Sequence, residues 1–150
     1  MTPARPDWLR TLALADADAL AVRADAVIAD YAFETLRAAE AGLVLVRARI
    51  AGDGERFNLG EATAARCVVR HRAPQGAFAG VGYVLGRDLA RAERIAKLDA
   101  LLQRDDLRPV LASTLLQPLA DAIAQRRAAR AGAAAATRVR FFTLASEATP

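Results

Sequence analysis

The stretch Gly42-Leu43-Val44-Leu45-Val46-Arg47-Ala48-Arg49-Ile50, together with Phe57-Asn58-Leu59-Gly60-Glu61, decides how this chain folds. Leu43–Ile50 has the composition of a β-strand, and a second strand is predicted from about Thr63 to Arg72. The intervening residues 51–56 are rich in Gly and Asp and lack apolar periodicity, which is typical of a turn. The pattern therefore predicts a β-hairpin.

Side chains alternate between the two faces of a strand, so each predicted strand has an apolar side and a basic side. Arg47 and Arg49 lie opposite the valines of the first strand, and Arg66 lies opposite Cys67 and Val69 of the second. We expect the two strands to present these sides together. The sheet would then have one basic face, formed by Arg47, Arg49, Arg66, Arg70, Arg72, Arg138 and Arg140.

The rest of the chain predicts an α+β fold in a single domain, residues 1–150. Two helices are expected before residue 32, and a short strand over Phe33–Arg37 is expected to turn at residues 38–42 into the hairpin. Phe78–Leu85 is a further strand, with Gly80 and Gly82 on one face that suggest a bulge or a closely approaching backbone. We therefore predict an antiparallel sheet of four to five strands.

Helices are expected on one face of this sheet. Asp88 is placed to cap an amphipathic helix in which Glu93 and Lys97 pair outward. A long helical stretch follows over residues 107–131, with Pro118 as a kink or break and Gly132 as a stop. Residues 138–144 alternate like a last strand.

Composition narrows the class of protein. Apolar residues make up 54% and charged residues 25% of 150, as in a soluble globular domain. Lys97 is the single lysine among 21 basic residues, so the positive charge is carried by arginine, which binds carboxylates and phosphates through two hydrogen bonds. One cysteine, no signal-peptide pattern and no long uncharged apolar run predict a cytoplasmic protein that does not enter a membrane.

Residues 57–66 hold the best candidate site. Asn58, Glu61 and Thr63 bring an amide, a carboxylate and a hydroxyl to one loop end beside Arg66. The alternative is structural, with Asn58 and Gly60 adopting unusual backbone angles and Glu61 paired with an arginine. We assign no catalytic residue and no metal ligand, because the one His and one Cys of the chain do not form a ligand pattern.

His71 and Cys67 have structural interpretations. His71 is predicted to be a surface residue near a strand end, and Cys67 a small buried apolar residue. The basic face has three interpretations: a solvated surface, a nucleic-acid surface, or a docking surface for an acidic partner or a polyphosphate. The third is favoured, because like charges across strands destabilise a sheet and no nucleic-acid motif is present.

Beyond these physical inferences, a series of segments resembles the PhnG family of the bacterial carbon–phosphorus lyase system. The similarity covers nearly the whole chain, in the order and at the spacing of the family. The segments that carry it are 41–49, Phe57–Thr63 with Arg66, Gly82–Asp88, Asp99–Gln103, Pro118-Leu119 and Phe141–Thr143.

The resemblance implies a subunit of a multi-subunit complex used in phosphonate catabolism. It implies PhnH, PhnI, PhnJ and PhnL subunits as partners, in an obligate hetero-oligomer. It also implies support for transfer of the ribose-triphosphate unit of ATP to an alkylphosphonate with release of adenine. ATP would be a substrate of the complex, with no cofactor bound by this chain.

Besides a nucleic-acid-binding module, which no motif supports, two functions remain open on the sequence alone. In the first, the chain is an accessory subunit that is inactive alone and uses Arg47, Arg49, Asn58, Glu61, Thr63 and Arg66 to bind substrate or partner. In the second, it is a small stand-alone enzyme acting on a phosphorylated substrate through Asn58, Glu61 and Arg66. We also expect the isolated chain to self-associate or behave poorly, because the Ala-rich residues 128–136 offer little bulk for burial.

Overall fold

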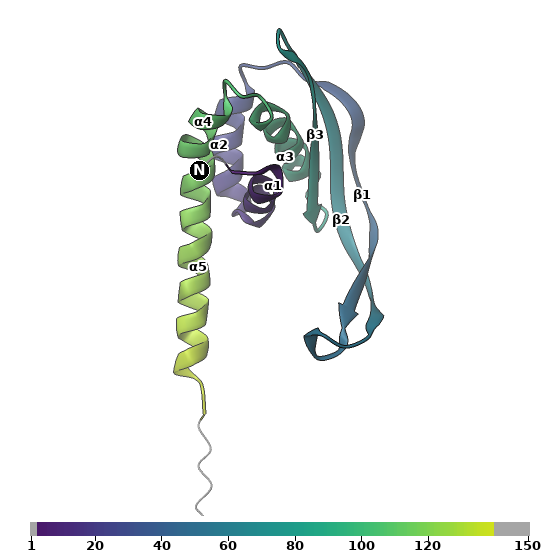
Figure 1. The fold of residues 1–150 in the computed structure, drawn as a ribbon, viewed down its shortest axis with the longest axis vertical. Helices are drawn as coiled ribbons and strands as arrows, with labels where there is room; N and C mark the ends of the chain where they lie inside the picture. Colours follow the sequence, from purple (N-terminus) through teal and green to yellow (C-terminus); the bar gives the residue numbers. More distant parts are fainter. Residues whose placement is uncertain (1–2, 140–150) are drawn as a thin grey trace, which may run out of the picture.

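The computed structural model describes residues 3–139 and shows an α+β protein with one three-stranded antiparallel sheet. The strands lie in the order β1-β2-β3, with bounds Glu34–Arg49, Arg56–Ala73 and Gly76–Leu85. The helices are α1 (Arg5–Leu14), α2 (Ala17–Ile28), α3 (Leu89–Leu102), α4 (Arg108–Leu111) and α5 (Gln117–Ala136). Figure 1 shows α3 against one face of the sheet, with the other helices on the same side.

The prediction of four to five strands is wrong for the described residues. The segments 33–37 and 43–50 belong to one strand, β1, and the turn expected between them is extended backbone paired with β2. The pairing of β1 with β2 shifts register between Thr35 and Arg37 and again between Arg37 and Glu40, and the strand continues through both shifts. Pairing along a partner strand overrides the weak strand preference of this Ala-rich segment. The last predicted strand, residues 138–144, lies outside the described residues from Arg140 onward, and Arg138 and Val139 are not in a strand.

The helix α3 approaches the sheet closely because β3 presents glycine to it. A methyl group on Gly82 would overlap the carbonyl oxygen of Ala92, and one on Gly80 would overlap that of Ala96. Side chains larger than glycine would push α3 away from β3. The close backbone approach predicted from these two glycines is confirmed, as is the cap at Asp88, which accepts a hydrogen bond from the amide of Arg91.

The core lies between the sheet and the helices. Ala65, Cys67 and Val69 of β2 are buried beneath α3. Helices α1 and α2 pack against α3, whereas α5 packs against α1. Asp16 caps α2 by accepting from the amides of Asp18 and Ala19. The predicted placement of helices on one sheet face is therefore confirmed, with α3 making most of the contact with the sheet.

The C-terminal helical stretch is continuous. Helix α4 passes through a π-helical segment, Ala112–Leu116, into α5. Pro118 lies just after this segment, where the amide of Gln117 bonds to the carbonyl oxygen of Ala112, so the proline coincides with a local change of helix type and not with a break. The expected stop at Gly132 is wrong, since α5 runs to Ala136. The surrounding alanines are the strongest helix formers and outweigh one glycine. No helix within residues 3–139 is long and apolar enough to cross a membrane.

Two elements extend beyond the core in the same direction, toward the lower end of Figure 1. One is the two-stranded end of the β1–β2 hairpin, residues 42–63, which we call the ribbon. It projects past β3, whose last residue, Leu85, pairs with Ala64. The other is the distal part of α5, whose last buried residue is Ile123. Neither the ribbon nor residues 124–136 contributes a residue to the core.

Candidate functional site

The predicted site residues lie in the ribbon, which is held by antiparallel pairing of β1 with β2. Leu43 pairs with Thr63, Leu45 with Glu61, Arg47 with Asn58 and Arg49 with Arg56. Leu59 has no partner in this register, so it forms a bulge between Asn58 and Gly60. Residues 57–61 are therefore part of β2 and not the loop end that the sequence suggested.

The prediction of one basic sheet face is wrong. The register is continuous from Glu40–Arg66 to Val46–Gly60, so Arg66 shares a face with Gly42, Val44 and Val46. Arg47 is one residue further along β1 and lies on the opposite face, with Arg49. Arg70 and Arg72 share the parity of Arg66 on β2. Shifting a pairing by one residue exchanges the faces, and alternation within each strand does not define that pairing.

Acidic residues of β1 neutralise the arginines on the outer face of the sheet. Glu40 accepts a hydrogen bond from Nε of Arg66 at 2.8 Å and lies 2.7 Å from Nε of Arg37. Glu34 lies 3.5 Å from both Arg70 and Arg72. The hydrogen bond from Arg66 lowers the pKa of Glu40, and the charges of Arg37 and Arg66 act in the same direction. These arginines have structural partners within the chain.

A different basic cluster lies at the end of the ribbon. Arg47, Arg49 and Arg56, which we call the tip arginines, line a shallow concavity together with Ala48. Arg49 donates a hydrogen bond from Nη1 to the carbonyl oxygen of Gly54 at 3.1 Å. Among residues 3–139, no carboxylate lies within ion-pair distance of the three, although Arg49 and Arg56 face each other directly. Opposed like charges without a counter-ion favour binding of an anionic group.

The structure brings together only some of the predicted site residues. Asn58, Glu61 and Thr63 share a face with Arg47 and follow one another along β2. Arg66 lies on the other face, bound to Glu40, and is eight residues from Asn58 along the strand, which corresponds to about 25 Å. Asn58, Glu61 and Arg66 therefore do not converge on one reacting atom. The signal that sequence reasoning missed is the pairing of Arg66 with Glu40.

His71 is buried, so its prediction as a surface residue is wrong. Its Nδ1 lies 3.0 Å from the carbonyl oxygen of Ala32, which can only accept, so Nδ1 carries the proton. Its Nε2 lies 3.0 Å from Nη1 of Arg104 and accepts from it. The rings of Tyr31 and Phe33 pack against the imidazole. His71 thus joins the start of β1 to the segment after α3.

The prediction that Cys67 is a buried apolar residue is confirmed. Its side chain is 1% exposed, and its thiol lies 3.4 Å from the carbonyl oxygen of Arg37, beside an irregularity in β1. Burial raises the pKa of the Cys67 thiol, which keeps it protonated and unreactive. Within residues 3–139, no group of three or more side chains is arranged to hold a metal ion.

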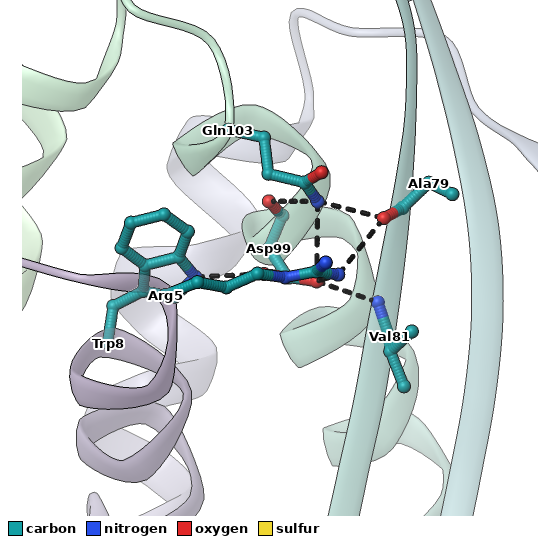
Figure 2. A network of polar contacts seen from close by, with 6 residues as sticks. All are labelled: Arg5, Trp8, Ala79, Val81, Asp99 and Gln103. Carbon is teal, nitrogen blue, oxygen red and sulfur yellow. Dashed lines mark hydrogen bonds and ion pairs between the residues drawn. The ribbon is translucent and has the colours of Figure 1, made fainter.

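Asp99 of α3 organises a polar network (Figure 2). From the sequence, Asp99–Gln103 is noted only as part of the resemblance, and no structural role is predicted for these residues. The fully buried carboxylate of Asp99 accepts hydrogen bonds from Nε and Nη2 of Arg5 at 3.1 and 2.6 Å and from Nε1 of Trp8 at 2.8 Å. It also accepts from the amide of Val81 at 2.9 Å. The network ties α1 to α3 and β3.

The same network closes the outer edge of β3. Gln103 and Arg5 donate to the carbonyl oxygen of Ala79 at 2.8 and 3.2 Å, next to the amide of Val81 that Asp99 binds. An edge strand normally presents such groups to a neighbouring molecule. Here the chain satisfies them itself, so this edge of the sheet is not free for pairing at residues 79–81.

Comparison with known proteins identifies the family. Residues 3–146 match the model of the family described as "Phosphonate metabolism protein PhnG". The chain belongs to the PhnG family. It is 39% identical over 140 residues to the alpha-D-ribose 1-methylphosphonate 5-triphosphate synthase subunit PhnG of Rhizobium meliloti (strain 1021). That alignment covers 93% of this chain and 87% of the relative. The match to the PhnG family includes the whole ribbon and the Asp99 network.

Proposed function

We propose that this chain is an accessory, non-catalytic subunit of a ribose 1-methylphosphonate 5-triphosphate synthase. The relative from Rhizobium meliloti carries the word subunit in its name, and its similarity extends over nearly all of both chains. The observation that carries the proposal is the ribbon, a projecting element with exposed apolar side chains and three arginines that have no counter-ion among the described residues. Such an element is suited to assembly with another protein.

The reaction of the proposed complex transfers the ribose-triphosphate unit of ATP to an alkylphosphonate. A phosphonate oxygen forms the new bond to the anomeric carbon of the ribose, the bond to adenine breaks, and adenine leaves. We assign this displacement to a partner subunit of the PhnI type, with PhnH, PhnJ and PhnL subunits as further members of the complex. This chain would support the partner that binds ATP, in the cytoplasm, without holding a cofactor of its own.

The geometry of the best catalytic candidates supports an accessory role. Arg66 is engaged by Glu40 on one sheet face, whereas Asn58 and Glu61 lie on the other. A stand-alone enzyme using these three residues would need them around one substrate. Glu61 pairs across the ribbon with Leu45 in an exposed position, with no other catalytic candidate beside it to act on the same atom.

Adenine release distinguishes the two functions. The purified chain, incubated with ATP and methylphosphonate, should release no adenine. The complex of PhnH, PhnI, PhnJ and PhnL subunits should form the alkylphosphonate ribose triphosphate with this chain and lose that activity without it. Release of adenine by the lone chain would overturn the accessory role and favour the stand-alone enzyme.

A Glu61→Gln variant within the complex provides the matched control. The amide keeps the size of the side chain and removes its charge, so an accessory role predicts turnover within about twofold of the parent complex, which is less than about 0.5 kcal/mol in the barrier. A loss of two or more orders of magnitude, with the complex still assembled, would show that Glu61 takes part in the chemistry.

A further inference from the structure

The ribbon carries several large apolar side chains that are exposed to solvent. Leu43 is 66% exposed, Leu45 57% and Leu59 64%, and Ile50 and Phe57 are also exposed. Leu43 and Leu45 lie on the face that forms the core further along the sheet, but here no helix covers them. A two-stranded ribbon without a covering layer is only marginally stable in water. Its apolar residues are therefore expected to be covered in the working protein.

The two edges of the sheet differ in whether side chains of the same chain bind their backbone groups. The Asp99 network satisfies backbone groups on the edge of β3, as described above. On the opposite edge, β1 pairs with β2 only, and its residues 41–46 are uncharged and free of bulges. An open, regular, apolar edge is a site where other chains bind. The edge formed by β1, which includes the ribbon, is thus the edge at which another protein chain can bind.

The chemistry of the ribbon changes along its length. Near the core, this face carries the apolar side chains of Leu43 and Leu45 on β1, beside the polar side chains of Thr63 and Glu61 on β2. Toward the tip, the same face carries Arg47 and Arg49, with Asn58 and Arg56 opposite. Asp53 and Glu55, in the connecting turn, form no ion pair with the tip arginines. A surface complementary to this face is apolar beside Leu43 and Leu45 of β1 and acidic around the tip arginines.

We propose that the ribbon, residues 42–63, inserts into a groove of another subunit of the synthase, apolar where Leu43 and Leu45 lie and acidic around the tip arginines. This inference rests on the proposed function as a subunit. A second copy of this chain is a poorer occupant, because pairing of two β1 edges would leave both faces of each ribbon exposed. The tip arginines would also lack the carboxylates that neutralise them.

The first test uses the assembled synthase, with the remaining subunits coexpressed and an affinity tag on this chain. The variant Leu43→Ser/Leu45→Ser removes apolar side chains from the ribbon alone. The matched control, Val22→Ser/Val110→Ser, removes two equally exposed valines from α2 and α4. We expect the ribbon variant to retain at least tenfold less of the other subunits, and the control to retain them as the parent does. Equal retention by the ribbon variant would overturn the proposal.

Loss of the other subunits could also follow from local unfolding of the Leu43→Ser/Leu45→Ser ribbon, so a second measurement leaves both substitutions out. A photo-crosslinking benzophenone side chain is placed at position 45 of the otherwise unchanged chain, and the purified complex is irradiated. Crosslinks to another subunit, mapped to an apolar groove by peptide mass spectrometry, are the expected result. Crosslinks to a second copy of this chain, or none, would overturn the proposal.

The two proposals fail in different ways. If the synthase lacking this chain forms product at the normal rate, the accessory function is wrong, whatever the ribbon contacts. If the chain is required for product but position 45 crosslinks to no other subunit, the function stands and the docking role of the ribbon is wrong.

Discussion

Asp99 is the residue on which the described fold depends most directly. Its carboxylate is fully buried and satisfies the guanidinium of Arg5, the indole N–H of Trp8 and the amide of Val81. Asp99→Ala would leave these donors without a partner inside the protein. We expect it to lower the free energy of unfolding by about 2–6 kcal/mol, because the indole N–H of Trp8 and the amide of Val81 each lose their acceptor at about 1–3 kcal/mol. Urea denaturation followed by circular dichroism measures the change.

A second variant tests the most exposed partner of Asp99. The side chain of Arg5 is 43% exposed, so water can replace much of what it loses when Asp99 is absent. Arg5→Gln leaves the carboxylate of Asp99 buried without its counter-charge, so it should lower the free energy of unfolding by about 3–5 kcal/mol. A much smaller loss would show that the donors Trp8 and Val81, and not the ion pair with Arg5, hold the carboxylate.

The thiol of Cys67 gives a prediction about reactivity. Because burial raises its pKa, the thiol is protonated at neutral pH, and the folded protein should react with an alkylating reagent far more slowly than the urea-unfolded protein. Cys67→Ala should remove only packing contacts, at about 1 kcal/mol, and leave the activity of the assembled complex nearly unchanged. Loss of activity in an intact complex would mean that the thiol takes part in the reaction.

His71 and Cys67 show what alternation along a strand can predict. Cys67, Val69 and His71 have the same parity on β2, and all three are buried. Applied consistently, the pattern that predicts a buried Cys67 also places His71 inside. His71 was predicted at the surface because it lies near a strand end, but it is buried, and Ala32 and Arg104 satisfy both ring nitrogens. Those partners come from segments far away in the sequence, which local patterns do not reveal.

At the scale of elements, the contact between β3 and α3 gives a matched pair of glycine variants. A methyl group at Gly82 overlaps the backbone of Ala92, which cannot move without shifting α3, whereas at Gly42 it meets no atom within 4 Å. Gly82→Ala should lower the free energy of unfolding by about 1–3 kcal/mol, as for other overpacked sites. Gly42→Ala should change it by less than about 0.5 kcal/mol. Thermal denaturation of both variants tests the difference.

The elements that were predicted well are those with strong local signals. Helix α3 has a cap at Asp88 and a pair formed by Glu93 and Lys97 at 2.7 Å, both predicted. The sheet was predicted less well, because its strand count and its faces depend on pairing between distant residues. Glu40 opposite Arg66 decides which arginines share a face, and nothing near either residue in the sequence indicates that pairing.

The candidate site likewise has residues that the sequence predicted and one that it did not. The sequence drew attention to Arg47 and Arg49 as anion-binding residues, and the structure places them in a cluster without a counter-ion in the described part of the chain. It did not indicate Arg56 as the third member, because that residue appeared to belong to a turn. Arg49 and Arg56 become neighbours only when the two strands pair.

For the whole molecule, we predict that the isolated chain self-associates in a concentration-dependent way. Residues 124–136 of α5 are exposed, mostly alanine and arginine, and small side chains allow another helix to approach closely. The exposed apolar residues of the ribbon add to this tendency. Analytical ultracentrifugation over micromolar concentrations measures the association, and a stable monomer throughout that range would contradict the prediction.

The tip arginines give the prediction that concerns the assembled complex. Arg47→Ala/Arg49→Ala should weaken retention of the other subunits or raise the apparent KM for ATP, because these side chains have no carboxylate of their own in the described residues. Loss of a buried charge-assisted pair at an interface costs about 2–5 kcal/mol. Both readouts are taken on one preparation, with circular dichroism to verify folding.

The matched control for that double variant is Arg70→Ala/Arg72→Ala. It removes the same number of charges from the same sheet, but these arginines lie outside the ribbon and are paired with Glu34 on the other face. Loss of exposed pairs of this kind costs at most about 1 kcal/mol each, so assembly and KM should change little. Because total charge changes equally, a general electrostatic effect predicts similar results for both variants. Only direct binding of an anionic group by Arg47 and Arg49 predicts a difference between them, and that difference should shrink as salt concentration rises, since salt screens exposed charges.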